Sequence, residues 1–192
     1  MPKAGSGLSL DALGIPLWLV AELTYKCPLK CAWCSNPVDF GRSRNEVARG
    51  LERRAAPGTP ARRLAARLHR RRADLRRDLE VLEDGRLGNY TNPITSGAGL
   101  SPERLRALKA AGHKQVQLSI QAPDRRLNEE LVGLDVFDRK LAIARAIKAE
   151  GLPMVLNAPV SRLNIERTGE MIAMAEDLGV ESVELANLQY DK

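Results

Sequence analysis

Aromatic side chains, histidines and long apolar runs are all scarce in this chain. Phe, Trp and Tyr together make up 4% of the 192 residues, so Leu, Val, Ile and Ala must fill most of the core. No apolar run approaches the roughly 18–20 residues that cross a bilayer. The short run at 15–19 leads into a polar segment without a cleavage-like site. We therefore expect a cytoplasmic protein that makes no membrane contact and has a length suited to one domain.

Cysteine is equally rare, and its placement is informative. The chain has three cysteines, all between positions 27 and 34. An odd and tightly clustered set does not suit a disulfide framework and more often binds a metal or acts in catalysis. The two histidines, His69 and His113, lie far from this set along the chain.

Acidic residues are nearly absent from one segment, which accounts for the net charge of +6. Residues 42–77 contain 13 Arg against three acidic residues, so the remainder of the chain is net negative. A nucleic-acid-binding domain usually spreads Lys and Arg over a face of its globular part, and no such stripe occurs here. We therefore expect no nucleic-acid partner.

Strand and helix patterns alternate over most of the chain. Turn residues, an N-cap at Ser101 with Pro102 behind it, and glycines at 112, 151 and 179 mark the boundaries. Such alternation predicts βαβ units, an α/β fold and a parallel sheet or barrel with outer helices. The expected strands are 18–24, 91–97, 115–122, 154–160 and 182–188, and the expected helices are 101–112, 137–150 and 165–178.

The Arg- and Ala-rich segment 44–73 interrupts this regularity. It has Pro57, Gly58 and Pro60 in its middle and no convincing strand, and a solvated pair of basic helices is one interpretation. We divide the chain into an N-terminal extension at 1–14 and a core domain at 15–190 that contains this anomalous segment.

Cys27, Cys31 and Cys34 are spaced C-x3-C-x2-C, with Trp33 immediately before the last cysteine. Thiolates bind iron–sulfur clusters, and four of them would fill every iron of a [4Fe–4S] cube. Three leave one iron open, which is what a substrate or cofactor needs in order to coordinate. The alternative is structural zinc, but zinc requires a fourth ligand, and neither histidine has a suitable spacing.

The motif C-x3-C-x-aromatic-C resembles the signature of the radical SAM superfamily. The surrounding sequence, which includes YTNPITSGAGL and QVQLSIQAPDRRLNEELVG, closely resembles the PqqA peptide cyclases of pyrroloquinoline quinone (PQQ) biosynthesis. The resemblance covers residues 15–42 and about 87–190.

This resemblance implies a partial (β/α)6 TIM-like barrel, here with a disrupted second βα unit, in which Cys27, Cys31 and Cys34 hold a [4Fe–4S] cluster. S-adenosyl-L-methionine would chelate the fourth iron, and one electron would cleave it to methionine and a 5′-deoxyadenosyl radical. In the cyclases that radical starts a carbon–carbon cross-link between Glu and Tyr side chains of the PqqA precursor peptide. The carrier protein PqqD presents the peptide, and a donor such as a flavodoxin supplies the electron.

Further cofactor contacts are expected from position. Trp33 occupies the aromatic place of the motif and should lie near the adenine, with plain packing as its alternative. Five polar residues at or near predicted strand ends are candidates for the ribose and the methionine carboxylate, although such residues also satisfy loop backbone. They are Thr95, Ser96, Ser119, Gln121 and Asn157.

The chain departs from the cyclases in two places. Their Gly-Gly-Glu-Pro-like stretch on the second strand has no counterpart in 42–88, and we hypothesise that 44–73 is translated out of frame or has diverged. The chain also ends at Lys192, before the cysteine-rich region that holds auxiliary clusters in the cyclases, as expected of a C-terminally truncated version. An inactive remnant that binds a cluster without turnover is therefore the alternative function.

Overall fold

The structure, a computed structural model, describes residues 19–22, 27–31, 33–34, 64–68 and 91–188. The expected N-terminal extension at 1–14 and most of the segment 44–73 lie outside these residues. None of the described helices combines the length and the apolar character that a bilayer crossing requires.

Six parallel strands form one sheet in the order of the chain, β1-β2-β3-β4-β5-β6. The strands are β1 (Leu19–Glu22), β2 (Leu64–Leu68), β3 (Thr91–Thr95), β4 (Val116–Ser119), β5 (Met154–Val160) and β6 (Ser182–Asn187). The described helices are α3 (Pro102–Ala110), α4 (Arg125–Val132), α5 (Phe137–Ala149) and α6 (Thr168–Asp177), the last preceded by a 3-10 turn at Ile165–Arg167.

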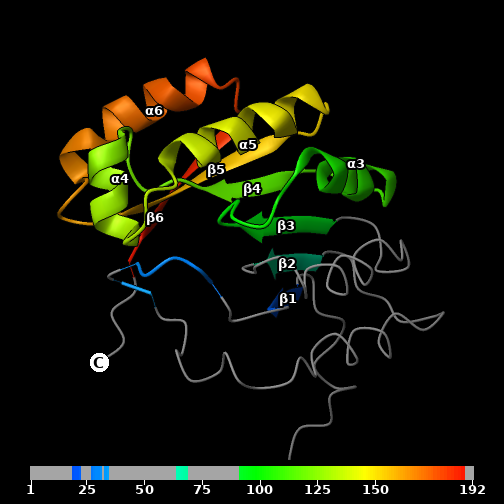
Figure 1. Cartoon of the computed structure of the whole chain (residues 1–192), viewed down its shortest axis with the longest axis horizontal. Helices are drawn as coiled ribbons and strands as arrows, with labels where there is room; N and C mark the ends of the chain where they lie inside the picture. Colours follow the sequence, from blue (N-terminus) through cyan, green and yellow to red (C-terminus); the bar gives the residue numbers. More distant parts are fainter. Residues whose placement is uncertain (1–18, 23–26, 32, 35–63, 69–90, 189–192) are drawn as a thin grey trace, which may run out of the picture.

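Helices α3, α5 and α6 cover the same face of the sheet (Figure 1). A sheet whose strands follow chain order, with its crossover helices all on one side, curls in a single direction. The molecule is therefore a partial (β/α)6 TIM-like barrel, and the fold expected from the sequence is confirmed.

The expectation that 44–73 lacks a strand is wrong. Leu64–Leu68 forms β2, which pairs in parallel with β1 on one side and β3 on the other. Ala66, for example, pairs with Ala21 and with Pro93. Ala and Arg have weak β propensity, but a central position between two strands provides ladder partners on both edges, and this context outweighs propensity. The chain between β2 and β3 lies outside the described residues.

The main core lies between the sheet and its helices. Residues of β4 and β5 alternate, so that Val116, Leu118 and Leu156 point into this layer and are fully buried. They pack against Leu105 and Leu108 of α3 and against further apolar side chains of α5 and α6, namely Ile143, Ala144, Ile147, Met171 and Ala175. The aliphatic core expected from the low aromatic content is confirmed.

Several element boundaries agree with the sequence signals. Strand β5 spans the predicted residues, and α3 begins behind Ser101, whose Oγ accepts a hydrogen bond from the Arg104 backbone N–H at 3.4 Å. The chain leaves α3 through Gly112, which has a left-handed φ of 86°. The Ser101 cap and Gly112 therefore set where α3 begins and ends.

We expect Leu156→Ala to lower the free energy of unfolding by about 2–5 kcal/mol, because Leu156 is fully buried and its truncation leaves a cavity. Urea denaturation followed by circular dichroism measures the change. The control is Ile172→Ala, since Ile172 on α6 is 41% exposed and its loss should change stability by less than about 0.5 kcal/mol. Equal losses in both variants would contradict the placement of the core.

Candidate cofactor site at the carboxyl edge of the sheet

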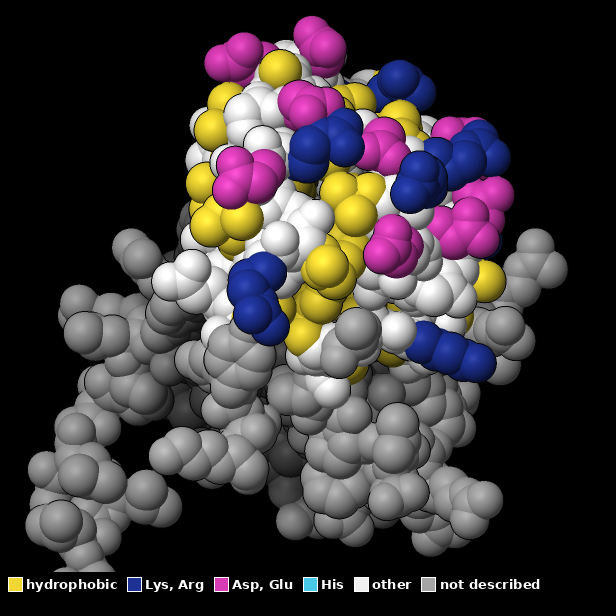
Figure 2. Space-filling view, turned by 90° about the vertical axis from the view of Figure 1, so that its left-hand side faces the viewer, with side chains coloured by type: hydrophobic (Ala, Val, Ile, Leu, Met, Phe, Trp, Pro, Cys, Tyr) yellow, Lys and Arg dark blue, Asp and Glu magenta, His cyan; other side chains and the backbone are white. Residues whose placement is uncertain are grey.

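The three cysteines lie on the loop that follows β1, at the edge where all six parallel strands end. Figure 1 shows this loop at the side to which the strand arrows point. Viewed from that side, a stripe of hydrophobic side chains runs between groups of basic and acidic ones (Figure 2). The carboxyl edge of a parallel barrel is where active sites are found, because the loops there can converge.

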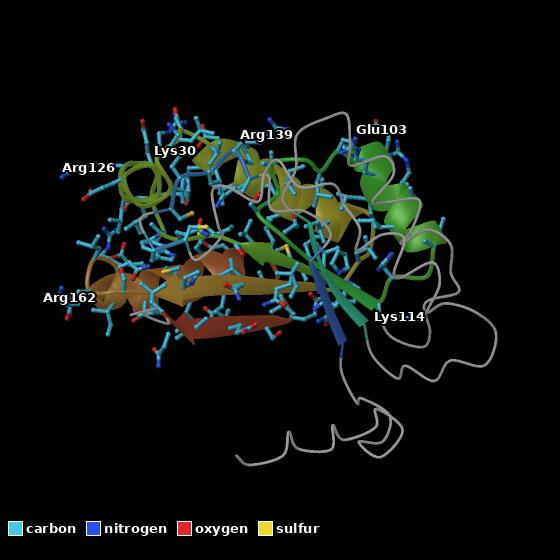
Figure 3. The ribbon with its side chains drawn as sticks, turned by 90° about the horizontal axis from the view of Figure 1, so that it is seen from below. Lys30, Glu103, Lys114, Arg126, Arg139 and Arg162 are labelled. Atoms are coloured by element: carbon cyan, nitrogen blue, oxygen red, sulfur yellow. The ribbon has the colours of Figure 1, made fainter. Side chains whose placement is uncertain are left out.

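Helix α4 holds the cysteine loop. The Lys30 backbone N–H donates a 2.8 Å hydrogen bond to the carbonyl of Val132, at the end of α4, and Figure 3 shows Lys30 beside this helix. Leu29 is buried with Leu131, Val132 and Ala122 in a second, smaller apolar cluster. Cys27, Cys31 and Trp33 pack against this cluster. The loop is therefore anchored by one backbone bond and one apolar contact surface.

Helix α4 is not among the helices expected from the sequence, although it has start and stop signals. Asp124 caps its first turn, where Oδ1 accepts a 3.0 Å hydrogen bond from the Leu127 backbone N–H. Gly133 ends the helix in the left-handed conformation, with φ 67°. The signals were Asp124, the pair Leu127 and Leu131 at i, i+4, and Gly133. The apolar side of this helix is well defined, but eight residues make only about two turns, which is short for recognition from a sequence pattern.

The three thiols are free and electrostatically coupled. Cys27 and Cys31 are half-buried, and Cys34 is exposed. Burial raises the pKa of Cys31 to about 11, and the Cys34 and Cys27 thiolates add to the rise. Burial also raises the pKa of Cys27, against the lowering effect of the Leu29 backbone N–H. Each thiolate thus opposes ionisation of another, and a cationic group that binds all three would relieve the repulsion.

Lys140 of α5 interacts electrostatically with these thiols and lowers the pKa of both Cys31 and Cys27. Its side chain is 2% exposed. Its Nζ donates a 2.9 Å hydrogen bond to the Ser119 carbonyl and a second one to Oε1 of Gln121. Burial lowers the pKa of Lys140 to about 8, and the thiolates of Cys31 and Cys27 counteract part of that effect.

The five polar residues expected at strand ends lie on the adjacent strands β3, β4 and β5. Thr95 and Ser96 are buried at the end of β3, where Thr95 Oγ1 accepts a 3.1 Å bond from the Gly97 N–H. The Ser96 hydroxyl lies close enough to Cys27 to lower its pKa, although outside regular hydrogen-bond geometry. It is thus a buried hydroxyl beside a cysteine with no regular partner among the described residues.

The remaining polar residues occupy β4 and β5. Ser119 and Gln121 both contact Lys140, and Asn157 is half-buried on β5, paired in register with Ser119. Trp33 is half-buried against the small apolar cluster, as the packing alternative requires. Cofactor contact by these residues remains a prediction.

Asn164 was not singled out from the sequence, and it links the ends of two strands. It is fully buried, and its Nδ2 donates 2.8 Å hydrogen bonds to the carbonyls of Gln121 and Pro159. Its Oδ1 accepts a 2.7 Å bond from the Ser161 backbone N–H. These satisfied bonds indicate a structural role that fixes Gln121 beside Lys140.

The face of the sheet opposite the helices carries a polar chain. Asn92 Nδ2 of β3 donates to Gln117 Oε1 at 3.4 Å, and Gln117 Nε2 donates to Glu184 Oε2 on β6. Gln117 is buried, although Glu184 is exposed. The concave side of the partial barrel is therefore polar, in contrast to the apolar layer under the helices.

A comparison with protein-family models decides the family. The model of the radical SAM superfamily matches residues 21–175, which include the second half of β1, the cysteine loop and the strands β2 to β5. The chain belongs to the radical SAM superfamily. Its cofactors are accordingly a [4Fe–4S] cluster and S-adenosylmethionine, and the expectation of both is confirmed.

Solved radical SAM enzymes share the fold. A crystal structure of SuiB from Streptococcus suis bound to S-adenosylmethionine matches with a TM-score of 0.73 and 22% identity, over 93% of this chain and 40% of that chain. Native anSMEcpe with bound AdoMet matches with a TM-score of 0.70 and 15% identity, over 91% of this chain and 53% of that chain. HydG, a maturase of the [FeFe]-hydrogenase, matches with a TM-score of 0.68 and 14% identity, over 90% of this chain and 43% of that chain. The chain thus spans about half of these proteins or less.

The donor set on the loop fits a four-iron cluster. Three thiols that are free of disulfides and interact electrostatically are suitable ligands for three irons. Among the described residues, no three His, Cys, Asp or Glu side chains meet closely enough to hold a single metal ion. Ligands that each bind a different iron do not need to converge on one point.

Gly133 tests the attachment of the loop to α4. A Cβ at this position would lie 3.1 Å from Cβ of Lys30, whereas a Cβ at Gly112 would have nothing within 4 Å. Both glycines have left-handed φ, so Gly133→Ala and Gly112→Ala should each lower stability by about 1 kcal/mol. We expect only Gly133→Ala to lower iron and sulfide uptake in anaerobic reconstitution. Equal uptake by both variants would contradict the role of α4 as the platform of the loop.

Proposed function

We propose that this chain is the radical SAM core of a PqqA peptide cyclase, in which Cys27, Cys31 and Cys34 bind three irons of the [4Fe–4S] cluster. The observation that carries the proposal is a single loop with three free, coupled thiols, anchored on α4 beside polar strand ends. Sequence likeness to the cyclases over 15–42 and about 87–190 supports the choice within the superfamily.

The polar strand ends next to the loop would hold S-adenosylmethionine. When bound, the cluster and the sulfonium supply a one-electron cleavage whose organic product abstracts a hydrogen atom. In this chain Ser96, beside Cys27, and Asn157 would orient the nucleotide and the amino acid portion, and Trp33 would lie against the adenine. The apolar cluster around Leu29 would keep water away from the thiolate side of the cluster.

A peptide is the substrate class that we propose. SuiB has been crystallised with its precursor peptide SuiA, and anSMEcpe with a Cp18Cys peptide. In this chain, Leu163 and Ile165 lie just after β5 at the same edge as the cysteine loop and are 57% and 51% exposed. Exposed apolar side chains beside a reactive centre are typical of a surface that binds a macromolecule.

The proposed product is PqqA with one carbon–carbon bond between a Glu and a Tyr side chain. Relative to the free peptide, it lacks two hydrogen atoms. One is abstracted into 5′-deoxyadenosine, and the other leaves as a proton and an electron that passes to an acceptor. PqqD as carrier, a flavodoxin as electron donor and a cytoplasmic location complete the proposal.

The first experiment measures turnover. After anaerobic reconstitution with iron and sulfide and reduction with dithionite, we expect the chain to release 5′-deoxyadenosine from S-adenosylmethionine. With PqqA and PqqD present, the peptide should lose the mass of two hydrogens in liquid chromatography–mass spectrometry. The variant with Cys27, Cys31 and Cys34 all replaced by Ala should bind no cluster and release no nucleoside, because no protein ligands remain for the iron.

The possible results separate the hypotheses. Nucleoside release without a change in PqqA would support the radical SAM activity and reject the cyclase. A full cluster without nucleoside release would support the inactive remnant. Cluster uptake by the triple Ala variant equal to that of the unaltered chain would reject the ligand assignment.

Substitution of the exposed apolar residues tests peptide binding. We expect Leu163→Ser combined with Ile165→Ser to weaken binding of fluorescently labelled PqqA by about tenfold, since two buried aliphatic contacts would be lost. The matched control is Ile172→Ser, because Ile172 is similarly exposed but lies on α6. Fluorescence anisotropy measures both. An equal effect in the control, or no effect in the double variant, would place the peptide elsewhere.

A further inference from the structure

Lys140 is buried because of its position on α5. It precedes Ile143, Ala144 and Ile147 at spacings of three, four and seven residues, so it belongs to the buried stripe of this helix. The neighbouring Arg139 is exposed and points outward (Figure 3), and its Nη2 donates a 2.9 Å hydrogen bond to the Ala98 carbonyl. The chain therefore inserts a cation, with 2% of its surface exposed, into a layer of aliphatic side chains.

The hydrogen-bond partners of this cation are neutral. Nζ donates to the Ser119 carbonyl and to the Gln121 amide oxygen, and no carboxylate among the described residues lies within ion-pair distance of it. Burial of a charge without an opposite charge costs several kcal/mol, and proteins normally compensate it with a counter-ion or a metal centre. Lys148, the other lysine of α5, is compensated at the surface by an ion pair with Glu181.

The groups beside Lys140 that become anions when they bind iron are cysteine thiols. Gln121, which accepts a hydrogen bond from Lys140, is followed by Ala122 of the small apolar cluster on which Cys27 and Cys31 pack. Lys140 interacts electrostatically with Cys31 and, less strongly, with Cys27. These two side chains pack on the small apolar cluster where water is partly excluded, so a charge placed there is screened less than on the surface. A three-thiolate iron–sulfur cluster is net negative and gains one more negative charge when it is reduced.

We propose that Lys140 is the buried counter-charge of the iron–sulfur cluster and a positioning residue that sets the cluster's reduction potential. This inference rests on the proposed role of the three cysteines as ligands. The ammonium group stabilises the reduced cluster more than the oxidised one, because the reduced cluster carries the greater negative charge. Through its bonds to Ser119 and Gln121, it also fixes the end of β4 relative to the cysteine loop.

The test is the midpoint potential of the reconstituted holoprotein, measured by redox titration with electron paramagnetic resonance. Lys140→Met removes the charge and the donor, and Lys140→Gln removes the charge but keeps an amide donor. Lys140→Arg keeps the charge. We expect both neutral variants to shift the one-electron reduction equilibrium about tenfold toward the oxidised cluster, a fall of about 59 mV, and the Arg variant to stay near the unaltered protein.

Arg145→Met is the matched control, because Arg145 is an exposed cation of the same helix. Its removal should leave the potential unchanged. Loss of the cluster in both neutral variants, with retention in Lys140→Arg, would also support the counter-charge.

Two results would overturn the inference: a potential that is unchanged in the neutral variants, or loss of the cluster in all three Lys140 variants, which would assign this residue to packing. Absence of a four-iron cluster in the unaltered chain would instead overturn the proposed function.

Discussion

A backbone hydrogen bond from Lys30 to Val132, together with the packing of Leu29 on α4, fixes the cysteine loop at the carboxyl edge of the sheet. Three cysteines on a free loop could take many positions, and ordering them would cost conformational entropy at the moment of cluster binding. Because the loop is anchored on α4, part of this conformational entropy is already lost when the chain folds, before the cluster binds. The cofactor site therefore depends on a helix of eight residues that supplies none of the proposed ligands.

Electrostatics links the same loop to the sheet. Burial and mutual repulsion raise the pKa values of Cys27 and Cys31, whereas Lys140 lowers them. Lys140 is held by the end of β4, and Asn164 ties that end to β5 through the carbonyls of Gln121 and Pro159. The strands that shape the site thus also position the positive charge of Lys140, which is opposite in sign to that of the thiolates. The radical SAM fold provides the carboxyl edge of the sheet where the loops meet. Lys140 and the cysteines determine the local charge at that edge.

The sequence predicted the strands and helices whose boundaries carry strong local signals, and it failed where context decides. Strand β5 and the Ser101 cap of α3 follow from apolar alternation and capping chemistry. Strand β2 has the composition LAARL, and its pairing with two neighbours, not its propensity, makes it a strand. Lys140 stands next to Arg139 with similar chemistry, and only its helical phase relative to Ile147 reveals that it is buried. Hydrogen bonds across strands, such as those of Asn164, have no local signal at all.

Three cysteine ligands leave one iron of the cluster free of protein ligands, and the proposed chemistry requires S-adenosylmethionine to reach that iron. Electron–nuclear double resonance on the reduced, reconstituted chain with S-adenosylmethionine labelled at the amino nitrogen and the carboxylate oxygen tests this most directly. We predict hyperfine coupling of both labels to the cluster. A fully loaded and reduced cluster that shows no coupling to either label would contradict the account.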